Sequence, residues 1–436
     1  MNNYPSGEYH QGEDVAPGPP VGSRGTFYWA DVREGLLDIA KGYEGKVQLV
    51  YMDPPFMTGN QFKYRQKAGE KGFVEHIAYS DQWVGGKEYY LNFMKRVFEH
   101  VYDLLTPEGS FYLHVDYRTS AYLRIILDGI FGEENFLNEI IWHYRSGGRA
   151  RRHFSRKHDN ILFYRKSSEH FFNIEAVGQE RGTEKRNNMK REVDHKGRVF
   201  WSIKSGGKVY RYYEDSKIYP SDVWTDISHL HQRDPERIGY DTQKPEALLE
   251  RIILSSSRPG DLVADFFAGS GTSLSVAAKL GRKWLGMDSS PHSMHVCRKR
   301  LLDLDTGRDF AIYYGGGIGP ADKAKLVAER YENGFSGDDN ASEGSNIIKI
   351  TDYMPADINK IQIQGNVSRA LRGLEYIDYW AVGYIKGNLY YPIKWARRMD
   401  GQSVVNNSIV LNGSVDQDMV IHVVDIAGDQ HFYKFT

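Results

Sequence analysis

Cysteine is almost absent from this sequence of 436 residues, in which Cys297 is the only one. A single cysteine excludes an internal disulfide, and a chain without disulfides is typical of a reducing compartment, so we expect a cytoplasmic protein. No Cys/His cluster has the spacing of zinc ligands, so no metal site is expected. No apolar run approaches the roughly 18 residues that span a bilayer, which excludes a transmembrane helix and a membrane partner.

Net charge is also nearly absent, because 56 Lys and Arg stand against 57 Asp and Glu. The distribution is uneven: residues 141–213 carry 18 Lys and Arg but 7 Asp and Glu, a local net charge of +11. A basic block inside an acidic chain is typical of a surface that binds a polyanion. A solvated basic face without a partner would have the same composition, so charge leaves both interpretations open.

The order of apolar runs and helical periodicities predicts an α/β protein with an insertion. Residues 1–24 are polar, contain Pro and Gly, lack the apolar core of a secretory signal, and are expected to form a flexible tail. Strand and helix patterns alternate over residues 25–166 and resume over 238–310, which predicts one doubly wound, parallel sheet built from two halves. The expected strands are 47–52, 110–115, 161–164, 261–265 and 283–287, and the expected helices are 90–105, 122–130, 247–254 and 273–280.

Two regions break this rhythm. Residues 167–237 are polar, basic and aromatic and contain no long periodic element, so they are expected to be an insertion between the two halves. Residues 320–436 contain short runs typical of strands, near 408–411 and 419–425, and are expected to form a small β-rich accessory domain.

A glycine motif lies between the expected strand 261–265 and the expected helix 273–280. It reads Asp265-Phe266-Phe267-Ala268-Gly269-Ser270-Gly271-Thr272. Glycines allow the backbone to turn sharply and to approach a ligand closely, and ligands of open α/β sheets lie outside the carboxyl ends of the strands. Asp288 ends the next strand, 23 residues after Asp265 in the sequence. An acidic residue at about this separation is typical of one that binds ribose hydroxyls. A tight turn with a surface Asp is the alternative, but the combination favours a nucleoside-containing cofactor.

A second motif, Asp53-Pro54-Pro55-Phe56, follows the expected strand 47–52. The carboxylate of Asp53 and the carbonyl of Pro54 are two acceptors, which is what the two N–H groups of an exocyclic amine require. Phe56 adds a flat apolar face. By itself, the motif is also typical of a Pro-Pro turn after a strand.

Together the two motifs resemble the signature motifs of DNA amino methyltransferases, and their order along the chain resembles the β class. Residues 242–253 are similar to the family's methionine-binding segment, and residues 29–36 to the segment that reaches the cofactor's adenine. The resemblance, supported by residues 221–227 and 236–240, covers roughly residues 25–305. The chain departs from the family where Phe56 replaces a frequent Tyr, and where Phe266 and Asp241 each replace a usual Pro.

The resemblance implies a Rossmann-like, S-adenosylmethionine-dependent methyltransferase core. Residues 25–166 would be its catalytic half, 238–310 its cofactor-binding half and 167–237 its target-recognition insertion. The implied reaction is methylation of adenine N6 in double-stranded DNA after base flipping. The implied catalytic residues are Asp53, Pro54, Pro55 and Phe56, and the implied cofactor-binding residues are Asp31, Lys244, Pro245, Asp265, Phe266, Phe267, Ala268, Gly269, Ser270, Gly271, Thr272 and Asp288.

Two of these cofactor residues also have ordinary structural interpretations. Lys244 and Pro245 would flank the methionyl group, but a solvated lysine before a Pro-initiated helix is a common arrangement. Asp31 would reach the cofactor, but Asp31 with Glu34 three residues later is also a capping-box pattern at a helix N-terminus.

A basic cluster precedes the insertion, beside Gly147 and Gly148. It is expected to clamp DNA phosphates, contacts that position a protein without reading sequence. Besides double-stranded DNA, the family resemblance makes a restriction endonuclease and a second copy of the chain expected partners. The basic cluster consists of Arg145, Arg149, Arg151, Arg152, Arg156 and Lys157.

Three alternatives remain open from the sequence. Cytosine N4 methylation is the nearest, since it also attacks an exocyclic amine; Asp53 favours adenine, because a Ser at this position more often accompanies cytosine in the family. A non-catalytic DNA-binding or specificity subunit would retain the fold but has no need of the intact motifs. A nicotinamide-dependent oxidoreductase could use the same sheet, but Asp53-Pro54-Pro55-Phe56 has no role in it.

Overall fold

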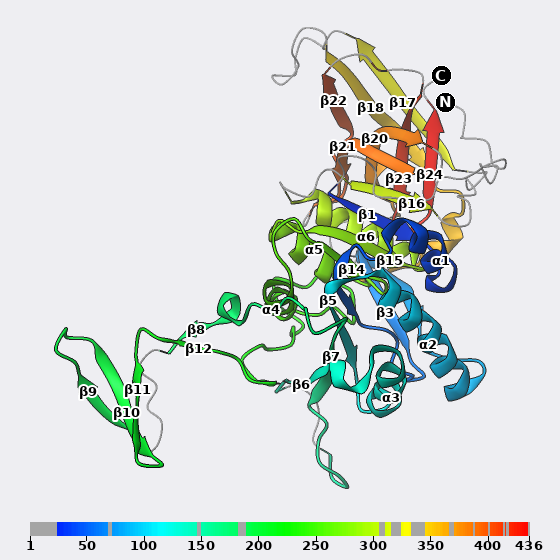
Figure 1. Cartoon of the computed structure of the whole chain (residues 1–436). Coiled ribbons are helices and arrows are strands. Elements are labelled where there is room, and N and C mark those ends of the chain that lie inside the picture. The colour runs from blue at the N-terminus through cyan, green and yellow to red at the C-terminus, as the bar shows by residue number, and fades with distance from the viewer. Residues whose placement is uncertain are drawn as a thin grey trace.

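The computed structural model describes most of the chain between residues 24 and 434. The expected N-terminal tail lies almost entirely outside the described residues, and so does Arg149 of the basic cluster. In Figure 1 an α/β core occupies the centre, a β-rich region lies above it, and an arm extends to the left. The described residues are 24–68, 72–145, 150–181, 189–304, 310–314, 324–332, 345–365, 370–386, 389–399, 402–412, 415 and 418–434.

The core is a twisted sheet whose central strands are parallel. Its strand order is β6-β7-β5-β2-β14-β15-β1, and the pairs β5–β2, β2–β14, β14–β15 and β15–β1 are parallel. The strands are β1 (Gly25–Trp29), β2 (Val47–Met52), β5 (Leu105–Val115), β6 (Phe136–His143), β7 (His158–Arg165), β14 (Leu262–Asp265) and β15 (Lys283–Asp288).

One strand departs from the expected all-parallel pattern. β7, expected at 161–164, lies antiparallel to both β5 and β6. The segment between β6 and β7 has no helix among its described residues, whereas a parallel pairing needs a crossover connection. The short β13 (Val223–Trp224) pairs in parallel with β6 at the sheet's edge.

Helices cover both faces of this sheet, which confirms the predicted doubly wound α/β fold. All six residues of β2 are buried because helices lie on both sides, and all but Gln48 are apolar or aromatic. The apolar side chains of α1, α2 and α3 pack on one face, and those of α4, α5 and α6 pack on the other. The helices are α1 (Val32–Tyr43), α2 (Gly86–Leu104), α3 (Ser120–Phe131), α4 (Glu246–Ser256), α5 (Thr272–Lys279) and α6 (Pro291–Leu302).

A hairpin that the sequence did not predict follows the Asp53 motif. β3 (Gln61–Ala68) and β4 (Gly72–Ser80) pair antiparallel. Exposed Lys63, Arg65 and Lys67 alternate with the buried Tyr64, Gln66 and Ala68 along β3, and this alternation is typical of a strand with one solvated face. Backbone hydrogen bonds from Arg65 to Gly239 and from Asp241 to Lys63 join the hairpin to the segment before α4.

The insertion forms an arm. β8 (Gln179–Glu180) pairs with β12 (Lys217–Ile218) as a stalk, after the short helical turn η2 (Ile174–Val177). A small antiparallel sheet lies beyond the stalk, away from the core in Figure 1. This regular structure was not expected from the sequence. The sheet consists of β9 (Lys190–Val193), β10 (Val199–Ser205) and β11 (Lys208–Tyr213).

The described residues of the C-terminal region form strands and short helical turns, and five of these strands extend the core sheet. β16 pairs in parallel with β1 and antiparallel with β21, and β20, β23 and β24 follow. Thirteen strands of the described chain therefore share one sheet. The added strands are β16 (Phe310–Tyr314), β21 (Leu389–Arg397), β20 (Ile377–Lys386), β23 (Met419–Asp425) and β24 (Gln430–Lys434).

The other C-terminal strands lie outside this sheet. Three of them form a separate antiparallel sheet, and β19 pairs with β4 of the hairpin. The strands expected near 408–411 and 419–425 are present, while the division of the chain into domains remains a prediction. No helix among the described residues is long and apolar enough to cross a membrane. The remaining elements are β17 (Lys325–Glu332), β18 (Ser345–Met354), β22 (Ser408–Asn412), β19 (Ile363–Gly365), η1 (Glu133–Asn135), η3 (Ile358–Lys360) and η4 (Gly373–Tyr376).

Candidate active site

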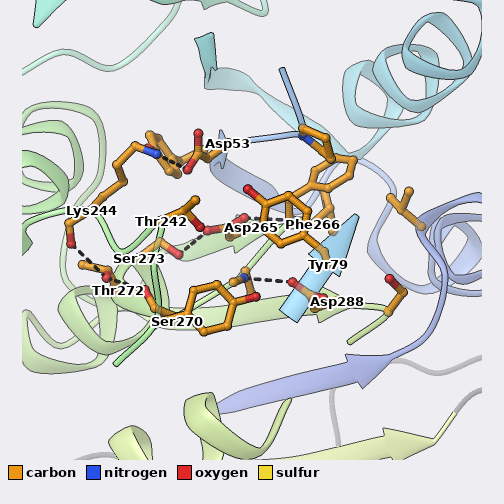
Figure 2. Close-up of a pocket in the computed structure, with 18 of the residues that line it drawn as sticks. Asp53, Tyr79, Thr242, Lys244, Asp265, Phe266, Ser270, Thr272, Ser273 and Asp288 are labelled. Atoms are coloured by element: carbon orange, nitrogen blue, oxygen red, sulfur yellow. Dashed lines mark hydrogen bonds and ion pairs between the residues drawn. The ribbon is translucent and has the colours of Figure 1, made fainter. Parts of the chain in front are cut away.

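A pocket of about 300 Å³ lies at the carboxyl ends of β2, β14 and β15, where ligands of open α/β sheets bind. Figure 2 shows residues from these strands and from the segment before α4 around it. The structure therefore brings the two sequence motifs to one cavity. The predicted site residues that line it are Asp31, Asp53, Pro55, Lys244, Asp265, Phe266, Phe267, Ala268, Gly269, Ser270, Thr272 and Asp288.

The glycine motif forms the turn between β14 and α5. Gly269 and Gly271 have φ angles of 51° and 70°, in the left-handed region that favours glycine. A Cβ atom on Gly271 would also lie 2.6 Å from the Sγ of Cys297, which is too close. Both glycines are therefore required by the backbone, and the turn leaves main-chain groups next to the pocket.

Asp288 holds this turn from the neighbouring strand. Its Oδ2 accepts a hydrogen bond from the Gly269 amide at 2.9 Å, and its Oδ1 accepts one from the Ser290 amide at 2.8 Å. Burial raises the pKa of the Asp288 carboxyl above its usual value. The Asp288 side chain also lines the pocket, so a ligand can reach its carboxylate.

Asp265 lies deeper, under the same turn. It accepts a hydrogen bond from the Phe267 amide at 3.0 Å and another from the Ser273 hydroxyl. Burial raises the pKa of Asp265 to about 7. Asp265 therefore joins the first residues of the motif to the first turn of α5.

This raised pKa makes a testable prediction about stability. Between about pH 4 and pH 7 the folded chain keeps a proton on Asp265 that the unfolded chain has lost, so this residue's contribution to stability falls as the pH rises through that window. An Asp265→Asn variant cannot ionise there. The quantity of interest is the free energy of unfolding of the variant minus that of the unsubstituted chain. We expect this difference to rise from pH 4 to 7 and to level off above pH 7. Urea unfolding at several pH values measures it; a pH-independent difference would contradict the assignment.

Asp53 follows β2 at the opposite side of the pocket. The Lys244 ammonium forms an ion pair with Asp53 Oδ2, as Figure 2 shows, and both side chains are largely buried. The Lys244 Nζ also lies 5.7 Å from the centre of the Phe56 ring. On the cofactor side, the Thr272 hydroxyl donates to the Lys244 carbonyl at 3.1 Å. Lys244 therefore connects the two motifs and is not the solvated lysine that the sequence left as an alternative.

Phe56 rests on a buried network that the sequence did not predict. Its ring stacks on His114 with centroids 6.1 Å apart and an interplanar angle of 20°. His114 Nδ1 lies 2.9 Å from the Tyr51 hydroxyl, and His114 Nε2 lies 3.1 Å from Asp159 Oδ2. Burial by itself raises the pKa of Asp159, but the hydrogen bond from His114 and nearby positive charge hold it below its usual value.

Asp31 lies at the N-terminus of α1 and lines the pocket together with Arg33. Its Oδ1 accepts from the Arg33 amide at 2.9 Å, and its Oδ2 accepts from Arg33 Nη2 at 2.7 Å. The hydrogen bond from Arg33 lowers the pKa of Asp31. Asp31 thus makes a capping contact and faces the cavity, although its side chain is bonded to Arg33 and not to the expected Glu34.

Comparison with known proteins adds the family. The family model described as DNA methylase (N6_N4_Mtase) matches residues 47–299, more than half of the chain, a span that includes both Asp53 and Asp288. This chain belongs to that DNA methylase family. Members of the family use S-adenosylmethionine as cofactor. The pocket fits such a molecule, because a buried acidic residue and a glycine turn lie at one side and the Lys244 ammonium at the other.

Three similar proteins illustrate the relationship. The methylase is 32% identical over 266 residues to the Type II methyltransferase M1.MboII of Moraxella bovis, covering 59% of this chain and 90% of the relative. It is 27% identical over 270 residues to the DNA adenine methyltransferase YhdJ of Escherichia coli K12, covering 62% and 80%. The solved PvuII DNA methyltransferase (cytosine-N4-specific) is 17% identical with a TM-score of 0.42, covering 65% of this chain and 90% of that chain.

Some predicted site residues of the methylase do not line the pocket directly. Pro54 is buried, Phe56 lies beside the pocket on His114, Pro245 precedes α4, and Gly271 acts on the turn's shape. Other lining residues were missed. The hairpin and the segment after it had no recognisable pattern. Tyr240 lay in a segment recognised only as family sequence, and Thr242 lay in the expected methionine-binding segment without being singled out. The missed lining residues are Val32, Arg33, Tyr51, Tyr79, Ser80, Trp83, Phe93, Tyr240, Thr242, Leu249, Ser273 and Ser289.

The predicted basic cluster of the methylase lies between β6 and β7. β6 ends and β7 begins at the same edge of the sheet as β2 ends, so this segment belongs to the edge that holds the pocket. Arg145, Arg151 and Arg152 are exposed and Lys157 is half-buried. The exposed Arg156 donates to the Tyr117 hydroxyl at 2.8 Å and lies over its ring.

Proposed function

We propose that this DNA methylase transfers a methyl group from S-adenosylmethionine to the exocyclic N6 of adenine in double-stranded DNA, after the base has left the stack. The observation that carries the proposal is the single cavity that joins Asp53 to the glycine turn and Asp288. A carboxylate suited to an amine thus lies across one pocket from residues suited to a nucleoside cofactor.

The cofactor residues divide the pocket by chemistry. Asp288, which lines the pocket, would hold the ribose hydroxyls, and Asp31 would face the adenine. The turn from Phe267 to Thr272 would contact the methionine end, beside Lys244 and Pro245. Asp265 and Phe266 would support the turn from below and from its side.

When bound, the cofactor would supply a methyl group on a positively charged sulfur. The target nitrogen would attack the methyl carbon in line with the breaking C–S bond, leaving a neutral thioether, and the methylated amine would then lose one proton to solvent. That nitrogen is a weak nucleophile because its lone pair is delocalised into the base. Asp53 and the Pro54 carbonyl would hold its two N–H groups and favour the geometry in which the lone pair is free, which is catalysis by positioning and electrostatics. Stacking on Phe56, worth about 1–3 kcal/mol, would offset part of the cost of flipping the base.

Lys244 contacts the groups that would bind the target base. Its ammonium and the target amine are both donors to the Asp53 carboxylate, and the ammonium also lies over the Phe56 ring on which the base would stack. We infer that Lys244 neutralises the largely buried Asp53 and would yield one carboxylate oxygen to the amine when the base enters.

Two observations support adenine as the target base in this proposal. Asp53 occupies the position at which the family more often has Ser when cytosine is methylated, and one similar protein, YhdJ, is named a DNA adenine methyltransferase. Cytosine N4 is the second candidate, because the family model spans both chemistries.

The test is to incubate the purified chain with labelled S-adenosylmethionine and duplex DNA and to identify the product nucleoside by mass spectrometry. N6-methyladenine supports the proposal. N4-methylcytosine as the product would make cytosine the target base and leave the proposed mechanism unchanged. If the cofactor binds but no methylated base forms, the result would favour a non-catalytic DNA-binding subunit.

Double-stranded DNA would contact two parts of the chain. The basic cluster between β6 and β7 would clamp phosphates next to the pocket, and the arm from β8 to β12 would read the target sequence. A restriction endonuclease partner, a homodimer and a cytoplasmic location remain predictions.

Replacing Arg151 and Arg152 together by alanine is expected to weaken DNA binding and to reduce its salt dependence. Each lost phosphate contact should lower the slope of log K against log salt by about 0.9. Fluorescence anisotropy of labelled duplex DNA at a series of salt concentrations measures the slope. The matched control replaces two exposed lysines of the C-terminal region, Lys360 and Lys394. Equal slopes for both double variants would contradict the assignment.

A further inference from the structure

The loop directly after the catalytic motif has an unusual backbone. Met57 has a φ angle of 58°, and it is the one non-glycine residue among those described with a positive φ. Side chains with a Cβ rarely adopt this region, so a non-glycine residue stays there only when its surroundings enforce it. Met57 follows Phe56 directly, so whatever enforces this turn also fixes where the Phe56 ring lies.

A single buried carboxylate, Asp81, enforces it. Asp81 follows β4 and is 1% exposed. Its Oδ1 accepts from the Met57 amide at 3.0 Å, and its Oδ2 accepts from the Thr58 amide and the Thr58 hydroxyl, each at 2.7 Å. Two backbone bonds add to these: the Asp81 amide donates to the Asn60 carbonyl at 2.9 Å, and the Gly59 amide donates to the Asp81 carbonyl at 3.2 Å.

The fourth donor to this carboxylate comes from the pocket wall. Trp83 Nε1 donates to Asp81 Oδ1 at 3.2 Å, and Trp83 itself lines the pocket. The indole ring packs on Tyr90 and Phe93 of α2, with ring centroids 4.9 Å and 5.1 Å away. Four donors match the acceptor capacity of a carboxylate. Asp81 therefore ties the loop after Phe56 to a wall fixed on helix α2.

We propose that Asp81 is a positioning residue for methyl transfer. It holds residues 56–60 so that Phe56, and with it Asp53 at the start of the same motif, is placed correctly for the target base next to the cofactor. This role rests on the proposed function, because it acts through Phe56 and Asp53. A misplacement of about 1 Å at a reacting centre can cost a hundredfold in rate, and this sets the size of the expected effect.

The experiment compares two Asp→Asn substitutions. Asp81→Asn keeps the size of the side chain but turns one acceptor into a donor, which must then face another donor. Asp425→Asn is the matched control in the C-terminal region: Asp425 is also fully buried and accepts from the Ala427 amide, the Asp429 amide and the Tyr353 hydroxyl at 2.9 to 3.1 Å. Both variants lose a buried carboxylate that holds a turn, but Asp81 alone faces the catalytic loop.

Three quantities are measured on the full chain: the single-turnover rate of methyl transfer to duplex DNA, the Kd for S-adenosylmethionine, and hydrogen exchange of peptides covering residues 56–60. For Asp81→Asn we expect a rate lowered about a hundredfold, a Kd within about threefold of the unsubstituted chain, and faster exchange at 56–60. For Asp425→Asn we expect the rate and the exchange at 56–60 to stay within about threefold.

Two results would overturn the proposal: an Asp81→Asn variant with a rate within about threefold of the unsubstituted chain, or equal losses of rate in both variants. If the unsubstituted chain transfers no methyl group, the proposed function fails on its own, and the exchange data decide separately whether Asp81 holds the loop.

Discussion

Asp53→Ala is expected to lower the rate of methyl transfer at least about a hundredfold while changing the Kd for S-adenosylmethionine by less than about threefold. The proposed partner of this carboxylate is the target amine. Its removal takes an acceptor from an oriented NH2 group in a largely buried site, a loss of a few kcal/mol of transition-state stabilisation. DNA affinity should change little, because phosphate contacts supply most of it.

The measurement is single-turnover transfer of tritium from labelled cofactor to duplex DNA, beside calorimetric titration of the cofactor. Asp53→Asn is the matched control, since it keeps one carbonyl acceptor and the size of the side chain, and we expect it to retain more activity than Asp53→Ala. The alanine variant also leaves Lys244 without its ion-pair partner, so thermal unfolding of both variants is recorded. Near-normal transfer by a folded Asp53→Ala chain would mean that the motif is only a turn.

Asp288→Ala is expected to weaken S-adenosylmethionine binding about a hundredfold or more. Two hydrogen bonds from ribose hydroxyls to a carboxylate are worth about 3 kcal/mol together, and a factor of ten in Kd corresponds to about 1.4 kcal/mol. The substitution also removes the acceptor of the Gly269 amide, so the glycine turn loses a contact that shapes it. Both effects act in the same direction.

Calorimetry measures this prediction, and two comparisons make it specific. Asp288→Asn keeps one acceptor oxygen and should bind the cofactor with intermediate affinity. DNA binding without cofactor should be unchanged in both variants, since Asp288 faces the pocket and not the basic cluster. Unchanged cofactor affinity in Asp288→Ala would remove the ribose assignment, and binding of NAD in place of S-adenosylmethionine by the unsubstituted chain would favour an oxidoreductase.

The residues predicted best are those whose chemistry is written locally. The Asp53 motif and the glycine motif each follow an expected strand, and the resemblance of the two together to DNA amino methyltransferases implied a shared site at the carboxyl ends of the sheet. The same reasoning identified Asp288 at the end of the next strand. The roles of these residues remain proposals.

Contacts between side chains that are far apart in the sequence could not be predicted from it. No local pattern distinguishes Asp81 from other acidic residues, because its contacts with residues 57 and 58 depend on the β3–β4 hairpin that separates them in the sequence. His114 and Asp159 look like ordinary strand residues until antiparallel β5 and β7 bring them together under Phe56. For Lys244, the local pattern of a lysine before a Pro-initiated helix gave no indication that its partner is Asp53, far away in the sequence.

The strand pairing between β16 and its two neighbours has a consequence for the chain as a folding unit. β1 and β21 both depend on β16 for backbone partners, and apolar side chains from both sides of this seam pack into one cluster. A shortened chain ending after α6 would leave β1 as an unpaired edge strand, the kind of surface at which sheets can aggregate. The catalytic core and the C-terminal region are therefore expected to gain and lose their structure cooperatively, although only one of them carries the motifs.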